Sequence, residues 1–330
     1  LSAIRFSKKE LQDWGINFGR FTRFENENSV WNPINPNIGG ELNQWGVWTG
    51  LAKILPPTRL SFLPYLSGGF RTSPTAKGYV TEFLKSGGMD VKYGINESFT
   101  LDMTLIPDFA QVQSDNVYRR IGAERSEVSS VLSKYGDSAD FQIIKNPGIT
   151  RLYNATKFSG RTKGNLGIGL FNAVTVPMYA KIRDLRNGKD SSILTEPLTN
   201  YNIIVFDQAL KNRSSITFTN TNVLRKGNSR NANVSSLNLS LFDKKNTYNY
   251  TFTGSYSSIW GKLGNENGFT TMAGFSKVSG MIQYRGGVSV ESDKYNPNDL
   301  GFLLNNNSFE YYGNINYIIN KPTRHFLNHN

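Results

Sequence analysis

The sequence predicts an all-β protein: an antiparallel, up-and-down transmembrane β-barrel that is incomplete in this chain and is preceded by the last strands of a β-sandwich module. Three observations predict the barrel. Apolar and polar residues alternate over long segments, no convincing helical period separates these segments, and Asn, Gly, Lys and Asp fill the connections. Alternation gives each strand two unlike faces, as a strand between lipid and a polar lumen requires.

Residues 308–319 carry the clearest alternation. Their alternate positions are Phe309, Tyr311, Gly313, Ile315, Tyr317 and Ile319. A strand of a soluble sandwich can alternate in the same way, but usual globular strands have only about 5–6 residues, whereas about 9–11 cross a membrane. Residues 247–258 repeat the pattern at a similar length. The length therefore favours membrane-spanning strands.

Residues 1–32 contain short strand-like segments that are too few to form a core. The run 14–23, followed by Trp31-Asn32-Pro33, resembles the last strands of the family 9-like carbohydrate-binding module of an uncharacterised Bacteroidetes outer-membrane family. In that family the module precedes a porin-like or TonB-receptor-like β-barrel. The resemblance implies three regions: the end of the module at 1–32, a linker or ordered loop at 33–58, and the barrel at 59–330.

The first barrel strands are expected at 59–70, 88–95 and 98–106, and Asn96-Glu97 makes a tight hairpin between the last two. The whole run 88–115 resembles the most recognisable segment of the same family. In that family a Phe-, Glu- and Pro-rich stretch then leads to an Arg-Arg-Ile-Gly motif. Here the motif at 119–122 follows almost directly. This departure predicts a deletion, or an unobserved segment joined over, near 117–118.

Residues 123–138 are polar and are expected to form an irregular excursion. The strand series then resumes, and the segment 295–303 again resembles a loop-and-strand motif of the family. Such a meander must close when it lies in lipid, because each unpaired backbone group there costs several kcal/mol. The remaining strands are expected at 149–159, 166–176, 201–207, 214–224, 234–242, 247–258, 268–276, 279–291 and 308–319.

The tail at 321–330 contains Pro322, which interrupts strand pairing, and ends in polar residues. Bacterial barrels usually finish on a strand with a terminal aromatic residue. We therefore expect that more strands follow Asn330, and that the strand at 308–319 does not pair with the first barrel strand.

The chemical inventory predicts no catalytic site, no metal site and no cofactor. Cysteine is absent, and the two histidines, His325 and His329, lie in a tail without helical pattern. Asp102 with Asp108, or Asp90 with Glu97, could in principle form a carboxylate pair for glycoside cleavage. The simpler interpretation is that Asp90, Lys92 and Asp102 line a wet lumen. The glycines at 164–169 lack the helix that a dinucleotide site needs, and they suit a bending strand better.

The net charge is +12, but Lys and Arg are scattered and often stand in expected turns, so nucleic acid is not expected as a partner. Tryptophans gather near the N-terminus, at positions 14, 31, 45 and 48. Trp14 and Trp31 are the candidate ligand-binding residues, because their faces could stack on sugar rings. Core packing or an interfacial aromatic belt is the competing explanation for each.

These features predict a non-enzymatic barrel in the Gram-negative outer membrane that takes part in glycan or nutrient handling, as the family resemblance implies. The alternative is a structural or accessory subunit of a larger outer-membrane assembly. The expected partners are outer-membrane lipid, other outer-membrane or periplasmic proteins, and glycans.

Overall fold

A computed structural model of the chain describes residues 6, 9–35, 38, 40–54, 59–75, 78–96, 98–106, 140–145, 150–227, 229–262 and 264–318. Most of these residues lie in strands, and the one helix among them is a single 3-10 turn, η1 (Leu42–Gln44). No helix in this part of the chain is long and apolar enough to cross a membrane. The predicted all-β, antiparallel fold class is confirmed.

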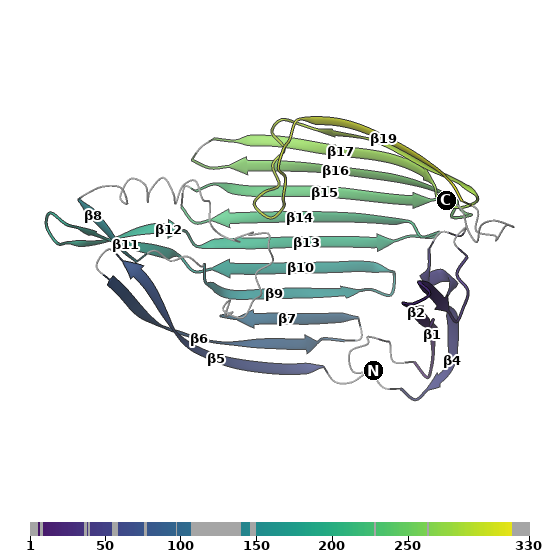
Figure 1. The fold of residues 1–330 in the computed structure, drawn as a ribbon, viewed down its shortest axis with the longest axis horizontal. Helices are drawn as coiled ribbons and strands as arrows, with labels where there is room; N and C mark the ends of the chain where they lie inside the picture. The colour runs from purple at the N-terminus through teal and green to yellow at the C-terminus, as the bar shows by residue number, and fades with distance from the viewer. Residues whose placement is uncertain are drawn as a thin grey trace.

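The main body is a 12-stranded antiparallel sheet in the order β19-β18-β17-β16-β15-β14-β13-β10-β9-β7-β6-β5 (Figure 1). Sequential strands pair with their neighbours throughout, apart from two excursions between β7 and β9 and between β10 and β13. The strands are β5 (Leu60–Thr75), β6 (Gly78–Gly94), β7 (Phe99–Leu105), β9 (Leu152–Arg161), β10 (Leu166–Thr175), β13 (Thr199–Ala209), β14 (Ser215–Arg225), β15 (Asn231–Phe242), β16 (Tyr248–Trp260), β17 (Glu266–Lys277), β18 (Ile282–Glu291) and β19 (Ser308–Tyr317).

Each strand predicted from 59 onward corresponds to a strand of this sheet, and β6 and β7 form the predicted hairpin, although the connection is 95–98 rather than the two residues expected. Sequence analysis missed a separate three-stranded sheet in the order β12-β11-β8. It consists of β8 (Phe141–Lys145), β11 (Met178–Asp184) and β12 (Asp190–Glu196) and lies within the two excursions. The irregular excursion expected at 123–138 and the motif at 119–122 fall outside the described residues.

The N-terminal region forms two small sheets, β1 (Leu11–Ile16) with β4 (Gly46–Ala52) and β2 (Gly19–Thr22) with β3 (Glu27–Val30). Strand β4 lies in the segment 33–58 that was expected to be a linker or ordered loop. It pairs antiparallel with β1, so part of that segment completes the sheet that precedes it. The expected domain boundaries themselves stay predictions.

The connections divide the large sheet into two unlike ends. At the turn end, short connections at 162–165, 210–214, 243–247 and 278–281 join neighbouring strands, and Asn165, Asn212 and Asn246 take positive φ of 63°, 55° and 52°. Asparagine tolerates this conformation, which explains the turn composition. At the loop end lie the excursions at 106–151 and 176–198 and the connection at 292–307. The N-terminal sheets lie beyond the turn end (Figure 1).

The described strands do not close into a cylinder. Strand β19 pairs with β18, and β5 pairs with β6, but the two outermost strands are not paired with each other. This confirms that the predicted strand at 308–319 does not complete a barrel with the first strand.

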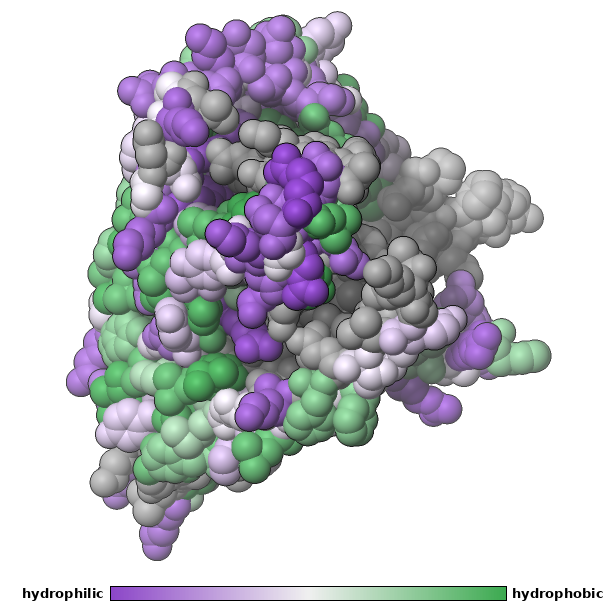
Figure 2. All heavy atoms as spheres, turned by 90° about the vertical axis from the view of Figure 1, so that its left-hand side faces the viewer, coloured by the Kyte–Doolittle hydropathy of each residue, from purple (hydrophilic) through white to green (hydrophobic). Residues whose placement is uncertain are grey.

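The alternation assigns every residue of the sheet to one of two faces. The inner face carries Ser236 and Asn238 of β15, whose hydroxyl and amide oxygens accept hydrogen bonds from Ser255 (2.9 Å) and Thr253 (2.8 Å) of β16. The outer face carries Leu237 and Leu239 of β15, which are paired with Gly254 and Phe252. Seen from the loop end, hydrophobic residues gather along the left and lower flank of the molecule (Figure 2).

The buried core sits on the inner face near the loop end. It is centred on Ala173, Tyr201 and Val223, which face one another across β10, β13 and β14. Tyr201 and Val223 are each 1% exposed. This end of the sheet therefore has its apolar core on the inside, although farther along β14 the inner face is polar.

Candidate functional site

The connection between β18 and β19, residues 292–307, folds over the inner face, and we call it the inner loop. A Cβ atom added to Gly268 of β17 would lie 2.1 Å from the backbone nitrogen of Tyr295, so only glycine allows the loop this approach. The backbone N–H of Asn296 donates a 3.1 Å hydrogen bond to Ser257 Oγ of β16. Figure 1 draws the loop as an olive trace that passes over neighbouring strands.

A buried ion pair fixes the middle of the inner loop. Asp299 accepts hydrogen bonds from Arg225 Nη2 at 2.8 Å and from Arg230 Nη2 at 3.0 Å. The side chains of Asp299 and Arg225 are each only 7% exposed. Charges removed from water in this way are stable only when they are paired, so the loop and the end of β14 depend on each other.

Apolar packing extends the loop farther across the sheet. Leu300 contacts the core cluster of Ala173, Tyr201 and Val223, beside the partly buried Leu152, Ala155 and Phe171. The inner loop thus begins at β18 and reaches the core cluster of β10, β13 and β14 on the inner face. The inner loop therefore covers the part of the inner face that lies near the loop end.

Charged residues occupy the inner face of β6, β7 and β9. Asp90 and Lys92 of β6 share this face with Asp102 of β7, and Lys157 of β9 stands directly opposite Asp102. Lys92 Nζ lies 3.4 Å from Asp102 Oδ1. The placement agrees with a polar wall of Asp90, Lys92 and Asp102. The partners proposed for a carboxylate pair, Glu97 and Asp108, lie outside the described residues.

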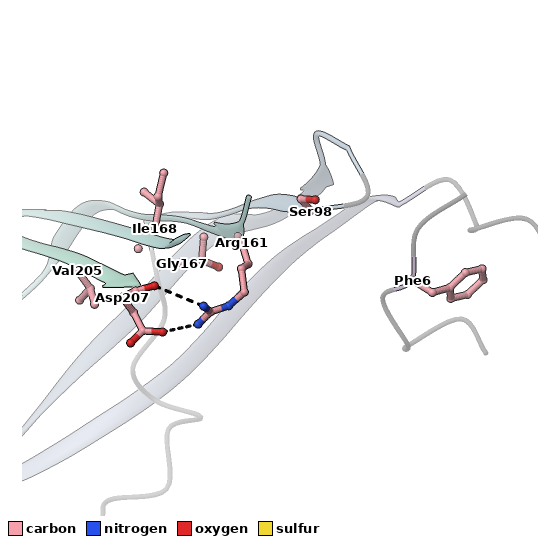
Figure 3. Close-up of a pocket in the computed structure, with 10 residues that line it drawn as sticks. Phe6, Ser98, Arg161, Gly167, Ile168, Val205 and Asp207 are labelled. Atoms are coloured by element: carbon pink, nitrogen blue, oxygen red, sulfur yellow. Dashed lines mark hydrogen bonds and ion pairs between the residues drawn. The ribbon is translucent and has the colours of Figure 1, made fainter. Parts of the chain in front are cut away.

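A second ion pair crosses a glycine at the turn end (Figure 3). Gly167 of β10 pairs with Arg161 on one side and with Asp207 on the other, and the Arg161 guanidinium passes over it to bind the Asp207 carboxylate. A Cβ at Gly167 would lie 3.0 Å from Arg161 Nη2. Thr217 Oγ1 donates a 2.8 Å hydrogen bond to the other oxygen of Asp207. Arg161, Gly167 and Asp207 help to line an open pocket of about 530 Å³.

The predicted glycine-rich segment is therefore a turn and a strand, as its lack of a helical context suggested. The reason for Gly167 is specific: an absent side chain lets the Arg161 ion pair form. A comparable arrangement occurs near the β19 edge, where the Tyr312 hydroxyl would lie 2.7 Å from a Cβ at Gly287 and 3.1 Å from one at Gly274. Sequence analysis found the glycines but could not identify the side chains that cross them.

The two sugar-stacking candidates lie in the N-terminal region, Trp14 within β1 and Trp31 directly after β3. The Trp14 ring packs against Phe6 (5.5 Å between centroids) and against Trp48 (6.5 Å). Trp31 contacts Phe18 at 5.9 Å and remains 60% exposed. Their ring contacts are with different residues, so the described contacts do not join Trp14 and Trp31 into one site. Their role as ligand-binding residues stays a prediction.

Among the described residues, no group of three or more His, Cys, Asp or Glu side chains could hold a metal ion. His325 and His329 lie outside these residues. Asp102 and Asp207 each form an ion pair with a basic side chain, Lys92 and Arg161 respectively. The inner face is suited to contact with polar, hydrated solutes.

The family model described as "Domain of unknown function (DUF5916)" matches residues 56–123 and 118–330. The two matches meet where the sequence departs from the expected family pattern. No curated protein matches the chain.

Two solved structures of OmpT, an in-vitro folded outer membrane protein of Vibrio cholerae, are similar to this chain. For the trimer form the TM-score is 0.29 and the identity 12%, over 78% of this chain and 95% of that chain. For the other structure the values are 0.26 and 10%, over 78% and 94%. We draw no conclusion from likenesses at these TM-scores. The expected Bacteroidetes origin and carbohydrate-binding module stay predictions.

Proposed function

We propose that this chain, which belongs to the family described as "Domain of unknown function (DUF5916)", is a non-enzymatic β-barrel protein of the Gram-negative outer membrane that handles glycans or other polar nutrients. In this proposal the outer face meets lipid and the inner face borders the path of the solute. The inner loop narrows that path at one end.

One observation carries the membrane proposal: large apolar side chains are exposed on the outer face, while inner positions of β15 and β16 carry polar side chains that are hydrogen-bonded to one another. On β19, Phe309, Tyr311 and Ile315 are 68%, 81% and 77% exposed. Soluble proteins rarely leave a contiguous apolar surface of this kind uncovered, whereas lipid covers it at no cost. The Ser, Thr and Asn side chains of the inner face supply partners for a hydrated solute.

The unequal connections support an orientation. Bacterial barrels have short periplasmic turns and longer extracellular loops. The turn end is therefore assigned to the periplasm, together with the N-terminal sheets that lie beyond it, and the loop end to the cell exterior. The inner loop then lies at the extracellular opening of the barrel. Trp31, whose exposed ring directly follows β3, is the residue that we propose for sugar stacking on the periplasmic side.

The alternative, a structural subunit of a larger outer-membrane assembly, is favoured by the unpaired edges of β5 and β19 in the described sheet. An open edge is a template for pairing with another strand. Extraction from native membranes in mild detergent separates the two functions. A bound oligosaccharide supports nutrient handling, and a stable protein partner without one supports assembly.

Charge substitutions on the two faces of one strand test the membrane proposal. Phe252, on the outer face of β16, is 37% exposed, and its neighbour Thr253 faces inward and binds Asn238. An arginine that faces lipid at midplane costs roughly 2–4 kcal/mol, whereas one in the lumen meets water. Phe252→Arg should therefore sharply reduce the amount of folded protein in outer-membrane fractions, and Thr253→Arg should leave most of it.

Outer-membrane fractionation with a heat-modifiability gel measures the folded, inserted protein for each variant. Equal recovery of both variants would show that the two faces are wrongly assigned. Recovery of the unaltered chain as a soluble monomer without detergent would reject the membrane proposal itself.

A further inference from the structure

The outer face is not equally apolar on all strands. On β19 apolar residues run from Phe309 to Tyr317, a distance of about 27 Å at ~3.4 Å per residue, close to the ~25 Å apolar band of outer-membrane barrels. On β13 the apolar outer residues are Ile204 and Phe206, which lie only about 7 Å apart along the strand. On β14 they are Ile216 and Phe218, followed by the polar Asn220 and Asn222 and then by Leu224, which is 43% exposed.

Asparagines replace the missing apolar residues. Asn172 of β10 stands opposite Asn202 of β13, Asn202 opposite Asn222 of β14, and Asn222 opposite Asn233 of β15. We call these residues, with Asn220 of β14, the asparagine face. Its members are half-buried and partly bonded to one another, because Asn172 Nδ2 donates to Asn202 Oδ1 at 2.8 Å and Asn220 exchanges hydrogen bonds of 3.1 and 3.2 Å with Asn233.

Lipid is a poor partner for this surface. An amide in hydrocarbon that keeps unused donors and acceptors is costly. On β13 an apolar band of roughly 7 Å leaves most of the membrane thickness uncovered, and on β14 two asparagines separate Phe218 from Leu224. Aromatic girdles normally mark the membrane interfaces, yet the outer positions of β13 and β14 carry no Tyr or Trp. Phosphate headgroups are recognised by Lys and Arg, and the asparagine face has neither.

A second copy of the chain fits the same surface well. Each asparagine amide both donates and accepts, so the face is complementary to itself, and polar side chains at membrane depth are normally packed against protein. Symmetric contacts between identical patches are the commonest form of self-association. We propose that the asparagine faces of two copies of this chain lie against each other in the membrane. The inference rests on the proposed outer-membrane location.

Cysteine cross-linking in native outer membranes tests the contact, because the full chain contains no cysteine of its own. Asn222→Cys places a thiol on the asparagine face, and the matched control Val288→Cys places one on the outer face of β18, where Val288 is 44% exposed. After mild oxidation, Asn222→Cys should give a reductant-sensitive band at twice the monomer mass. Val288→Cys should remain monomeric.

A second variant distinguishes a stable contact between two copies from cross-linking by random encounter in the membrane. Asn202→Leu combined with Asn222→Leu extends the apolar band, so it should lower the dimer fraction in mild detergent at least several-fold while the chain still inserts. Three results would overturn the inference and leave the proposed function standing. They are inserted protein that is monomeric in every experiment, equal cross-linking of Asn222→Cys and Val288→Cys, and a cross-linked band whose mass indicates another protein. Loss of the unaltered chain from outer membranes would instead reject the proposed function.

Discussion

The two ends of β13 and β14 bury opposite kinds of surface. Near the turn end Phe206 and Phe218 point outward, and the inner face carries the polar Thr217 and Asp207. Near the loop end the inner face holds Tyr201 and Val223 in a dry core, and the outer face carries asparagines. Strand β14 thus has polar inner residues and apolar outer residues near the turn end, whereas near the loop end its inner face carries the buried Val223 and its outer face carries asparagines and Leu224. What covers each face, rather than the strand itself, determines which residues it carries.

The inner loop accounts for this inversion, because it supplies the second layer that an apolar inner face needs. The largest expected effect therefore comes from releasing it. Asp299→Ala leaves Arg225 and Arg230 without their shared carboxylate in a buried site, which typically costs about 3–5 kcal/mol. We expect rapid protease cleavage within 292–307 and a larger conductance in planar bilayers.

The matched control for Asp299→Ala is Asp190→Ala. It breaks the ion pair with Arg183 on the separate three-stranded sheet, where both side chains are about half exposed. Exposed pairs contribute little, so neither protease sensitivity nor conductance should change. Similar behaviour of the two variants would mean that the inner loop is not held by Asp299, and the two ends would then differ for another reason.

Adding a hydroxyl at one inner position of β14 and removing one at another tests whether the two ends of its inner face differ in polarity. Val223→Thr places an unpaired hydroxyl in the core at the loop end and should cost about 1–3 kcal/mol. Thr219→Val, on the same face nearer the turn end, removes a hydroxyl from a polar surface and should be nearly neutral. Urea or guanidinium unfolding in detergent micelles measures both. Equal costs would show that the inner face has one character along its whole length.

A smaller effect is expected from Gly167→Ala at the turn end. The new methyl group would approach Arg161 Nη2 to 3.0 Å and push the guanidinium away from Asp207. This pair is partly exposed, with side chains 46% and 30% accessible, so its loss should cost less than the loss of Asp299. Gly169→Ala is the control, because its added carbon would meet Val205 at an ordinary 3.6 Å. On a heat-modifiability gel, the folded band of Gly167→Ala should disappear at a lower temperature than that of Gly169→Ala.

Local pattern was sufficient to predict the strands but not their coverage. The alternation in 247–258 and 308–319 identifies two faces, and both strands exist. Alternation does not state which face is inside, so the sequence Asn220-Thr221-Asn222-Val223 looks the same whether asparagine or valine is buried. Burial of Val223 depends on Leu300, far along the chain. The family resemblance identified 295–303 as a motif, and only the fold places it on the inner face.

The missed strands have a similar cause. Strand β11 offers only Ala180 and Ile182 as buried apolar residues, and its partner β8 lies more than 30 positions earlier. Such short strands are specified by their partners more than by their own sequence. The Arg161–Asp207 pair also joins distant residues, and Gly167 between them gave no separate signal. The sequence thus predicts local elements well and predicts contacts between distant segments poorly.

The smallest expected effect concerns a turn that belongs to neither buried surface. Asp243 begins the connection from β15 to β16, and its carboxylate accepts hydrogen bonds from the backbone N–H groups of Tyr248 (2.8 Å) and Thr247 (2.6 Å). These bonds, with Tyr248 the leading cause, lower the pKa of Asp243 below its ordinary value of 3.8. A lowered pKa means that the charged form stabilises the turn. Its contribution is complete above the ordinary pKa and is lost as the pH falls through the lower folded value.

Amide hydrogen exchange of Thr247 and Tyr248, corrected for intrinsic rates, should therefore show constant protection from pH 7 to pH 5 and reduced protection in strong acid. Asp243→Asn keeps an acceptor oxygen but has no charge to lose, so protection in this variant should be lower at neutral pH and should not change with acid. Exchange on the inner loop should not follow this titration, because Asp243 lies at the turn end and Asp299 at the loop end. A parallel loss of protection at both places would show that the two ends unfold as one unit, and the contrast between them would then be one of composition only.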